Sequence, residues 1–248
     1  QGQIFTREHI EALEQVGLAQ PEQKLPNLVS SSVLVLLLAS FLALYLRLER
    51  VSLSRDPRSI ALVVMLFLAF GITARLVIPG HTVIPYAFPL AAYSLIVAAL
   101  FGAETAMVTF LPLAIMAAYG LPNALDLTLY YILGGLLGVL VLRRARRITA
   151  YFFAGAAVAV AGSAVVVVYR LSGIDTIGLA TLVASALFNG LASASITLLL
   201  QFALAQFLGM TTALQLLELS RPDQPLLRQL LRDAPGTYQH SLQVSNLA

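Results

Sequence analysis

The chain has 248 residues, of which 59% are hydrophobic and only 11% are charged, and this composition excludes a soluble globular domain. The sequence therefore predicts an integral membrane protein. It contains no cysteine, which excludes disulfides and thiolate metal sites. The formal net charge of +3 matters less than where the basic residues lie, because Lys and Arg set the orientation of a membrane protein.

The N-terminal segment, residues 1–28, is polar, and we expect it to be the end of an extracytoplasmic domain. Its stretch TREHIEALEQVG predicts one short helix, with Thr6 as the cap and Gly17 at the end. The chain starts at Gln1 without a methionine and stops within a polar pattern. We therefore expect it to be a fragment of a longer protein.

Seven apolar runs follow, and they predict an all-α polytopic bundle of seven transmembrane helices over residues 29–208. A bilayer core needs about 20 apolar residues per helix. Five runs fit this length, whereas the fourth is short and the seventh is long. The runs cover residues 29–46, 60–78, 83–101, 106–119, 125–142, 148–169 and 176–208.

Arginines alternate between the loops in the way that membrane topology requires. The loops after the second, fourth and sixth runs hold only the flanking Arg75 and Arg170. Because cytoplasmic loops carry the excess of Lys and Arg, we expect the N-terminus outside the plasma membrane and the C-terminus in the cytoplasm. The loops after the first and fifth runs hold Arg47, Arg50, Arg55, Arg58, Arg143, Arg144, Arg146 and Arg147.

The stretch LRRARR has no interleaved aromatic residues. It therefore indicates a topology signal. Without a base-stacking aromatic residue it does not indicate binding to a nucleic acid polymer, whereas a contact with anionic lipid stays open.

The seventh run is too long for one simple crossing, because 33 residues would make a helix of about 50 Å against a core of about 30 Å. We expect it to tilt, break or project, with Asn189 and Gly190 as a hinge near its middle. Gln201 and Gln206 indicate a stretch that leaves the lipid. Residues 209–232 then predict an amphipathic cytoplasmic connector interrupted by prolines.

Polar residues are sparse among the apolar runs, and most of them fall at predicted helix ends, where water or lipid headgroups reach them. They are Arg75, His81, Glu104, Asp126, Asp175 and Asn189. Arg75 lies inside its run, and we consider the hypothesis that it pairs with Asp126 or Asp175 in an outward-facing ligand site. The absence of a Gly-rich phosphate loop, a Walker pattern and a zincin motif argues against an ATP-driven pump within these residues.

The C-terminal string LLELSRPDQPLLRQLLRDAPGTYQHSLQVSNLA resembles the entry to the catalytic domain of the seven-transmembrane HD phosphohydrolases. These are membrane-bound bacterial phosphodiesterases that hydrolyse cyclic di-AMP. The matching features are Leu-Leu-Glu-Leu, Pro-Leu-Leu, Ala-Pro-Gly-Thr-Tyr and the His-Ser pair. The resemblance implies that an extracellular domain precedes seven membrane helices and that an all-α HD domain starts at residues 233–248.

The same resemblance implies a metal site for hydrolysis of cyclic di-AMP to linear pApA. His240 would be one ligand of two divalent ions, Mn or Fe, and the other ligands would lie beyond Ala248, so the active site is incomplete here. The chain departs from the family where Gln239 replaces a frequent second histidine, and where Phe202 and Ala205 stand in place of an expected proline and glutamate. The resemblance also allows an unidentified extracellular ligand and a homo-oligomer as partners.

Two other interpretations remain open from the sequence. The short, proline-bearing third and fourth runs also fit a small-molecule transporter or its substrate-binding membrane subunit. A degenerate HD protein would bind nucleotide without cleaving it. A His-Asp pair about 25 to 40 residues beyond His240 would favour the enzyme over both.

Overall fold

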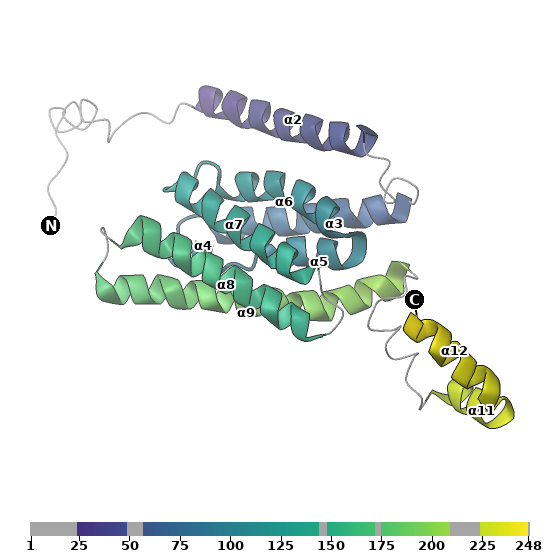
Figure 1. The fold of residues 1–248 in the computed structure, drawn as a ribbon. Helices are drawn as coiled ribbons and strands as arrows, with labels where there is room; N and C mark the ends of the chain where they lie inside the picture. Colours follow the sequence, from purple (N-terminus) through teal and green to yellow (C-terminus); the bar gives the residue numbers. More distant parts are fainter. Residues whose placement is uncertain (1–23, 49–56, 144–147, 172–174, 209–223, 248) are drawn as a thin grey trace, which may run out of the picture. The chain divides into compact units, whose positions relative to one another are not determined.

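The computed structural model describes residues 24–48, 57–143, 148–171, 175–208 and 224–247. Every regular element within these ranges is helical, which confirms the predicted all-α polytopic class (Figure 1). The predicted helix around Thr6 and the first part of the connector lie outside the described residues. The chain divides into two units, Gln1–Arg50 and Val51–Ala248, and each is described by itself.

The first unit contains one described helix, α2 (Lys24–Leu48). Its proline, Pro26, lies in the first turn, where a missing N–H breaks no intrahelical hydrogen bond. The basic residue in the last turn, Arg47, interacts favourably with the negative end of the helix dipole. Residues Leu28–Arg47 are apolar and long enough to cross a bilayer.

The second unit contains a helical bundle in which α8 packs against both α7 and α9, and α5 packs against α6, α7 and α9. Most of α5 is buried, including Tyr93, Leu95 and Ile96, so this short helix lies in the core. The bundle helices are α3 (Pro57–Val77), α4 (Ile84–Ala87), α5 (Ala91–Phe101), α6 (Ala103–Ala118), α7 (Ala124–Leu142), α8 (Thr149–Arg170) and α9 (Thr176–Leu208).

Six helical segments in the described part of the chain are long and apolar enough to cross a membrane. One of them, Ile84–Phe101, combines α4 and α5. The helix α6, with 16 residues, would be about 24 Å long against a core of about 30 Å. The predicted polytopic bundle is therefore confirmed, whereas seven crossings remain a prediction.

The break between α4 and α5 has a local cause. Phe88 adopts an extended backbone (φ −67°, ψ 121°), because a residue that precedes proline is disfavoured in the helical region. The turn between α5 and α6 is at Gly102, whose φ of 94° is readily accessible only to glycine. The run 83–101, predicted as one helix, is thus two helices followed by a tight turn.

Two glycines bring α8 and α9 close together. A Cβ atom added to Gly190 would lie 2.3 Å from the carbonyl oxygen of Gly155, and one added to Gly155 would lie 2.6 Å from the carbonyl oxygen of Gly190. Small residues allow such close helix packing in membranes. Because α9 is one continuous helix through this point, the hinge at Asn189 and Gly190 stays a prediction, and Gly190 has a packing role as well.

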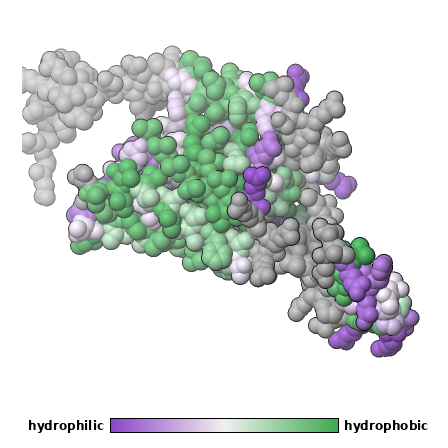
Figure 2. Space-filling model, in the orientation of Figure 1, coloured by the Kyte–Doolittle hydropathy of each residue, from purple (hydrophilic) through white to green (hydrophobic). Residues whose placement is uncertain are grey.

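The C-terminal described residues form α11 (Pro225–Asp233) and α12 (Pro235–Leu247), which contact each other. A proline begins each helix, at the position where its missing N–H is tolerated. This pair is largely hydrophilic in Figure 2, whereas the visible face of the bundle is mostly hydrophobic. Exposed Leu76, Val168 and Leu199 contribute to the apolar surface, as expected of helices that face lipid.

Candidate functional site

A pocket of about 660 Å³ lies at the end of the bundle where α3, α6 and α8 end and α4, α7 and α9 begin. We call it the Arg170 pocket. Its volume falls in the range of about 300–1,000 Å³ that is usual for small-molecule sites. It is lined by Ile78, Gly80, His81, Thr82, Val83, Pro85, Tyr86, Leu121, Pro122, Asn123, Leu127, Arg170, Gly178, Thr181 and Leu182.

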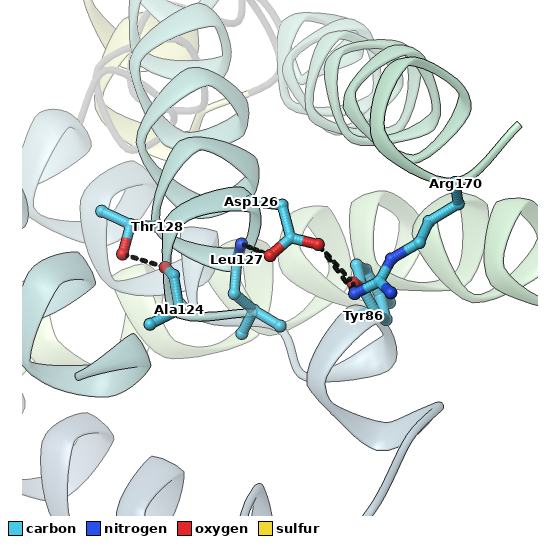
Figure 3. A network of polar contacts seen from close by, with 6 residues as sticks. All are labelled: Tyr86, Ala124, Asp126, Leu127, Thr128 and Arg170. Carbon is cyan, nitrogen blue, oxygen red and sulfur yellow. Dashed lines mark hydrogen bonds and ion pairs between the residues drawn. The ribbon is translucent and has the colours of Figure 1, made fainter. Parts of the chain in front are cut away.

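Polar contacts among Arg170, Asp126 and Tyr86 connect three helices at this pocket (Figure 3). Arg170, in the last turn of α8, donates from Nη2 to Oδ2 of Asp126 in the first turn of α7 at 2.7 Å. The same Nη2 donates to the Tyr86 hydroxyl of α4 at 3.0 Å. The other Asp126 oxygen, Oδ1, accepts the backbone N–H of Leu127 at 3.1 Å.

The positions of both charges suit their helices. The Asp126 carboxylate lies at the positive end of α7, and the Arg170 guanidinium lies at the negative end of α8, so each helix dipole stabilises its own residue. Asp126 is buried and Arg170 is mostly buried. Removing one partner would therefore leave a poorly solvated charge.

The hypothesised partners of Arg75 were wrong. Arg75 donates from Nη1 to the backbone oxygen of Tyr119 at 2.6 Å, and Asp175 accepts the N–H of Gly178 at 3.2 Å. Asp126 is paired with Arg170 instead. In the sequence Arg170 only flanks the sixth run, and its separation of 44 positions from Asp126 gives no local signal of their pairing.

A row of buried polar residues runs along α9, and sequence reasoning missed it. The row, which we call the α9 polar row, comprises Ser185, Asn189, Ser193, Thr197 and Gln201. Their regular spacing of four places them along one ridge of the helix. That spacing is visible in the sequence and could have predicted an inward-facing polar stripe.

Hydrogen bonds connect the Arg170 pocket to this row through one tyrosine. The Tyr130 hydroxyl of α7 donates to the backbone oxygen of Tyr86 at 2.6 Å and accepts from Nδ2 of Asn189 at 2.9 Å. Asn189 then accepts from the hydroxyl of Ser193 at 3.1 Å. The contacts thus run from an ion pair at one end of the bundle to the middle of α9.

The row continues beyond its middle with further partners. Thr197 donates to the backbone oxygen of Ser193 at 2.6 Å and approaches that of Ala92 in α5 at 3.5 Å. Gln201, expected to mark the exit of α9 from lipid, is buried and accepts a hydrogen bond from the Tyr151 hydroxyl of α8. The row therefore ties α9 to α5, α7 and α8.

The predicted metal ligand, His240, is exposed on α12. Among the described residues there is no group of three or more His, Cys, Asp or Glu side chains that could hold a metal ion. A single imidazole cannot form a two-metal centre by itself, because such a centre needs several converging ligands.

Comparisons with known proteins bear on the whole chain. The sequence model of the family described as "7TM receptor with intracellular HD hydrolase" matches residues 25–212. The chain is similar to the "Cyclic-di-AMP phosphodiesterase PgpH" of Bacillus subtilis (strain 168), with 26% identity over 258 aligned positions that cover 99% of this chain. The protein of the same name from Listeria monocytogenes serotype 1/2a (strain 10403S) is 26% identical over 100% of this chain.

The chain spans 36% of the length of each of these two curated relatives. No solved structure matches this chain.

Proposed function

Because the chain belongs to the family of 7TM receptors with an intracellular HD hydrolase, we propose that it is the membrane sensor and transmission part of a cyclic di-AMP phosphodiesterase. The observation that carries the proposal is the similarity to two proteins named as cyclic di-AMP phosphodiesterases across nearly the whole chain. The sequence motif ending in His240 and Ser241 supports it independently. The transporter alternative has no comparable support.

The orientation is part of this proposal. The arginine pattern favours an extracytoplasmic N-terminus and a cytoplasmic C-terminus. The Arg170 pocket lies at the end of the bundle opposite to Arg143, because α7 ends at that arginine and begins at the pocket. In this orientation the pocket opens toward the outside of the cell.

Cysteine labelling tests the orientation. A cysteine at Gln20 should react with a membrane-impermeant maleimide in intact cells, whereas one at Ala145 should react only after permeabilisation. The chain has no cysteine of its own, so label on this chain reports the introduced cysteine alone. The reverse pattern would contradict the proposed topology.

The metal site belongs to the longer protein. We propose that His240 supplies one ligand there, together with side chains that are outside this chain. Bound divalent ions would supply Lewis-acid activation of water and of the phosphodiester. His240 would contribute a neutral imidazole nitrogen to that site.

Hydrolysis by the longer protein tests the function. We expect it to convert cyclic di-AMP to linear pApA with Mn²⁺ or Fe²⁺, with little inhibition by excess cyclic di-GMP. His240→Ala should lower the rate at least 100-fold, because metal-ligand loss disables the centre. Gln239→Ala, at the neighbouring exposed position, is the matched control and should stay within about threefold of wild type. Equal rates for both variants would contradict the role of His240.

A further inference from the structure

We propose that the Arg170 pocket binds a small amphiphilic monocarboxylate, with the carboxylate on the Arg170 guanidinium and the apolar body against the pocket walls. This inference deepens the sensor role and rests on the proposed function only for its biological consequence. The binding itself depends on this chain alone. It can therefore fail while the phosphodiesterase proposal stands, and the reverse also holds.

The mostly apolar lining of the pocket suits a ligand with an apolar body. Its walls include Ile78, Val83, Leu121, Leu127 and Leu182, and no acidic side chain is among the lining residues. Arg170 is the lining residue that always carries a positive charge. A mostly apolar wall with few polar groups is the usual composition of a small-molecule site.

One hydrogen-bond donor of Arg170 has no acceptor. Arg170 donates from the same atom, Nη2, to both Asp126 and Tyr86. Its Nε atom is buried and has no hydrogen-bond partner. A buried donor without an acceptor costs free energy. Both two-point forks of a guanidinium include Nη2, so a carboxylate that binds Arg170 in bidentate geometry replaces its contact with Asp126 or with Tyr86.

The local charge disfavours a ligand with more than one negative charge. Asp126 already offsets part of the Arg170 charge through a single contact at 2.7 Å, and it also accepts from the Leu127 N–H and Tyr86. Because Arg170 and Asp126 together are neutral, a monocarboxylate adds one unit of negative charge beside Asp126, whereas a doubly charged phosphate would add two. A monocarboxylate adds less repulsion and matches the same fork.

Binding at this position would reach the α9 polar row. A carboxylate on Arg170 competes for the guanidinium that now contacts Asp126 and Tyr86. Tyr86 is also the residue whose backbone oxygen accepts the Tyr130 hydrogen bond. An occupied pocket therefore shifts the arrangement from which Tyr130 contacts Asn189.

Calorimetric titration of the chain in phosphatidylcholine nanodiscs at pH 7 tests the inference. The probes are 3-phenylpropionate, 4-phenylbutyrate and octanoate, each compared with its uncharged amide. We expect saturable one-site binding of at least one acid, and at least tenfold weaker binding of its amide. No saturable binding of any of the three acids would overturn the proposal.

Variants assign the site. The double change Arg170→Gln with Asp126→Asn removes both charges, so that neither is left unpaired, and should weaken binding of the acid at least tenfold. Arg75→Gln is the matched control, because Arg75 contacts Tyr119 and does not line the pocket, and it should bind as wild type does. Unchanged affinity in the double variant, with its helix content retained, would overturn the assignment.

Anionic lipid is the remaining source of an oxyanion. Nanodiscs that contain phosphatidylglycerol should leave the affinity for the acid within about twofold, since the proposed ligand is not a phosphodiester. Competition by phosphatidylglycerol that disappears in the double variant would instead assign the pocket to a lipid headgroup and overturn the carboxylate proposal.

Discussion

Asn189 lies at the centre of the polar contacts within the bundle. Its amide donates to Tyr130 and its carbonyl oxygen accepts from Ser193, so both ends of the side chain have partners. Lipid offers no water to replace them. This explains how an amide is tolerated in the middle of a helix that is apolar enough to cross a membrane.

A double-mutant cycle on Asn189 and Tyr130 should measure their coupling. Asn189→Ala and Tyr130→Phe each remove one side of the 2.9 Å contact. We expect a coupling free energy of about 0.5–1.5 kcal/mol, as for interhelical hydrogen bonds in other membrane proteins. The free energy of unfolding in mixed micelles is the measurement. Additive effects of the two changes would show that this hydrogen bond contributes no stability.

Gly190→Ala should destabilise the contact between α8 and α9. The new Cβ would lie 2.3 Å from the Gly155 oxygen and 2.7 Å from the Ala159 Cβ, and such overpacking typically costs about 1–3 kcal/mol. Gly134→Ala is the matched control, because its Cβ would meet Val158 at an ordinary 3.6 Å. Thermal unfolding in detergent compares the two. If Gly190 were only a hinge, alanine there would leave stability unchanged or raised.

At the scale of residues, the sequence located polar side chains better than it located their partners. Asn189 and Asp126 stood out because they interrupt apolar runs. Tyr130 and Arg170 did not, since one is a common membrane aromatic and the other flanks a run. The pairing of these residues depends on how the helices pack, and a single sequence does not contain that information.

The helices α5 and α6 form a tight hairpin around Gly102, in which α5 has 11 residues and α6 has 16. The sequence located both apolar runs, but it placed the start of the fourth at 106 where α6 begins at Ala103. Pro89 in the sequence indicates a kink at the break before Leu90, whereas hydropathy alone is insensitive to such a local change of backbone direction. Helix length decides whether this hairpin crosses the membrane fully.

Labelling at Glu104 should determine how far the hairpin reaches. Glu104 is exposed in the first turn of α6, next to the turn. If α4 and α5 cross the bilayer, Glu104→Cys should react from the cytoplasmic side, as a cysteine at Ala145 does. Thr82→Cys, exposed between α3 and α4, is the control for the outer side. A cysteine at 104 protected from both sides would show that the hairpin is re-entrant, with five crossings in place of seven.

For the whole molecule, composition was sufficient to predict a polytopic all-α membrane protein, since 59% hydrophobic residues leave few alternatives. The prediction of the family from the sequence depended on a short polar motif near His240. The apolar character of the spans was not specific enough, because many proteins share it. The Arg170 pocket could not be predicted, because its lining residues come from six helix ends and loops that are distant in sequence.

The central claim is that the bundle controls hydrolysis of cyclic di-AMP, and the α9 polar row offers a path for that control. The measurement is the initial rate of pApA formation by the longer protein in nanodiscs, with and without a flexible Gly/Ser insertion after Gly209. A flexible segment transmits displacement poorly. Asn189→Ala should therefore change the rate at least twofold in the uninterrupted protein and have no effect in the protein with the insertion. Absence of hydrolysis, or identical rates in all of these proteins, would contradict the account.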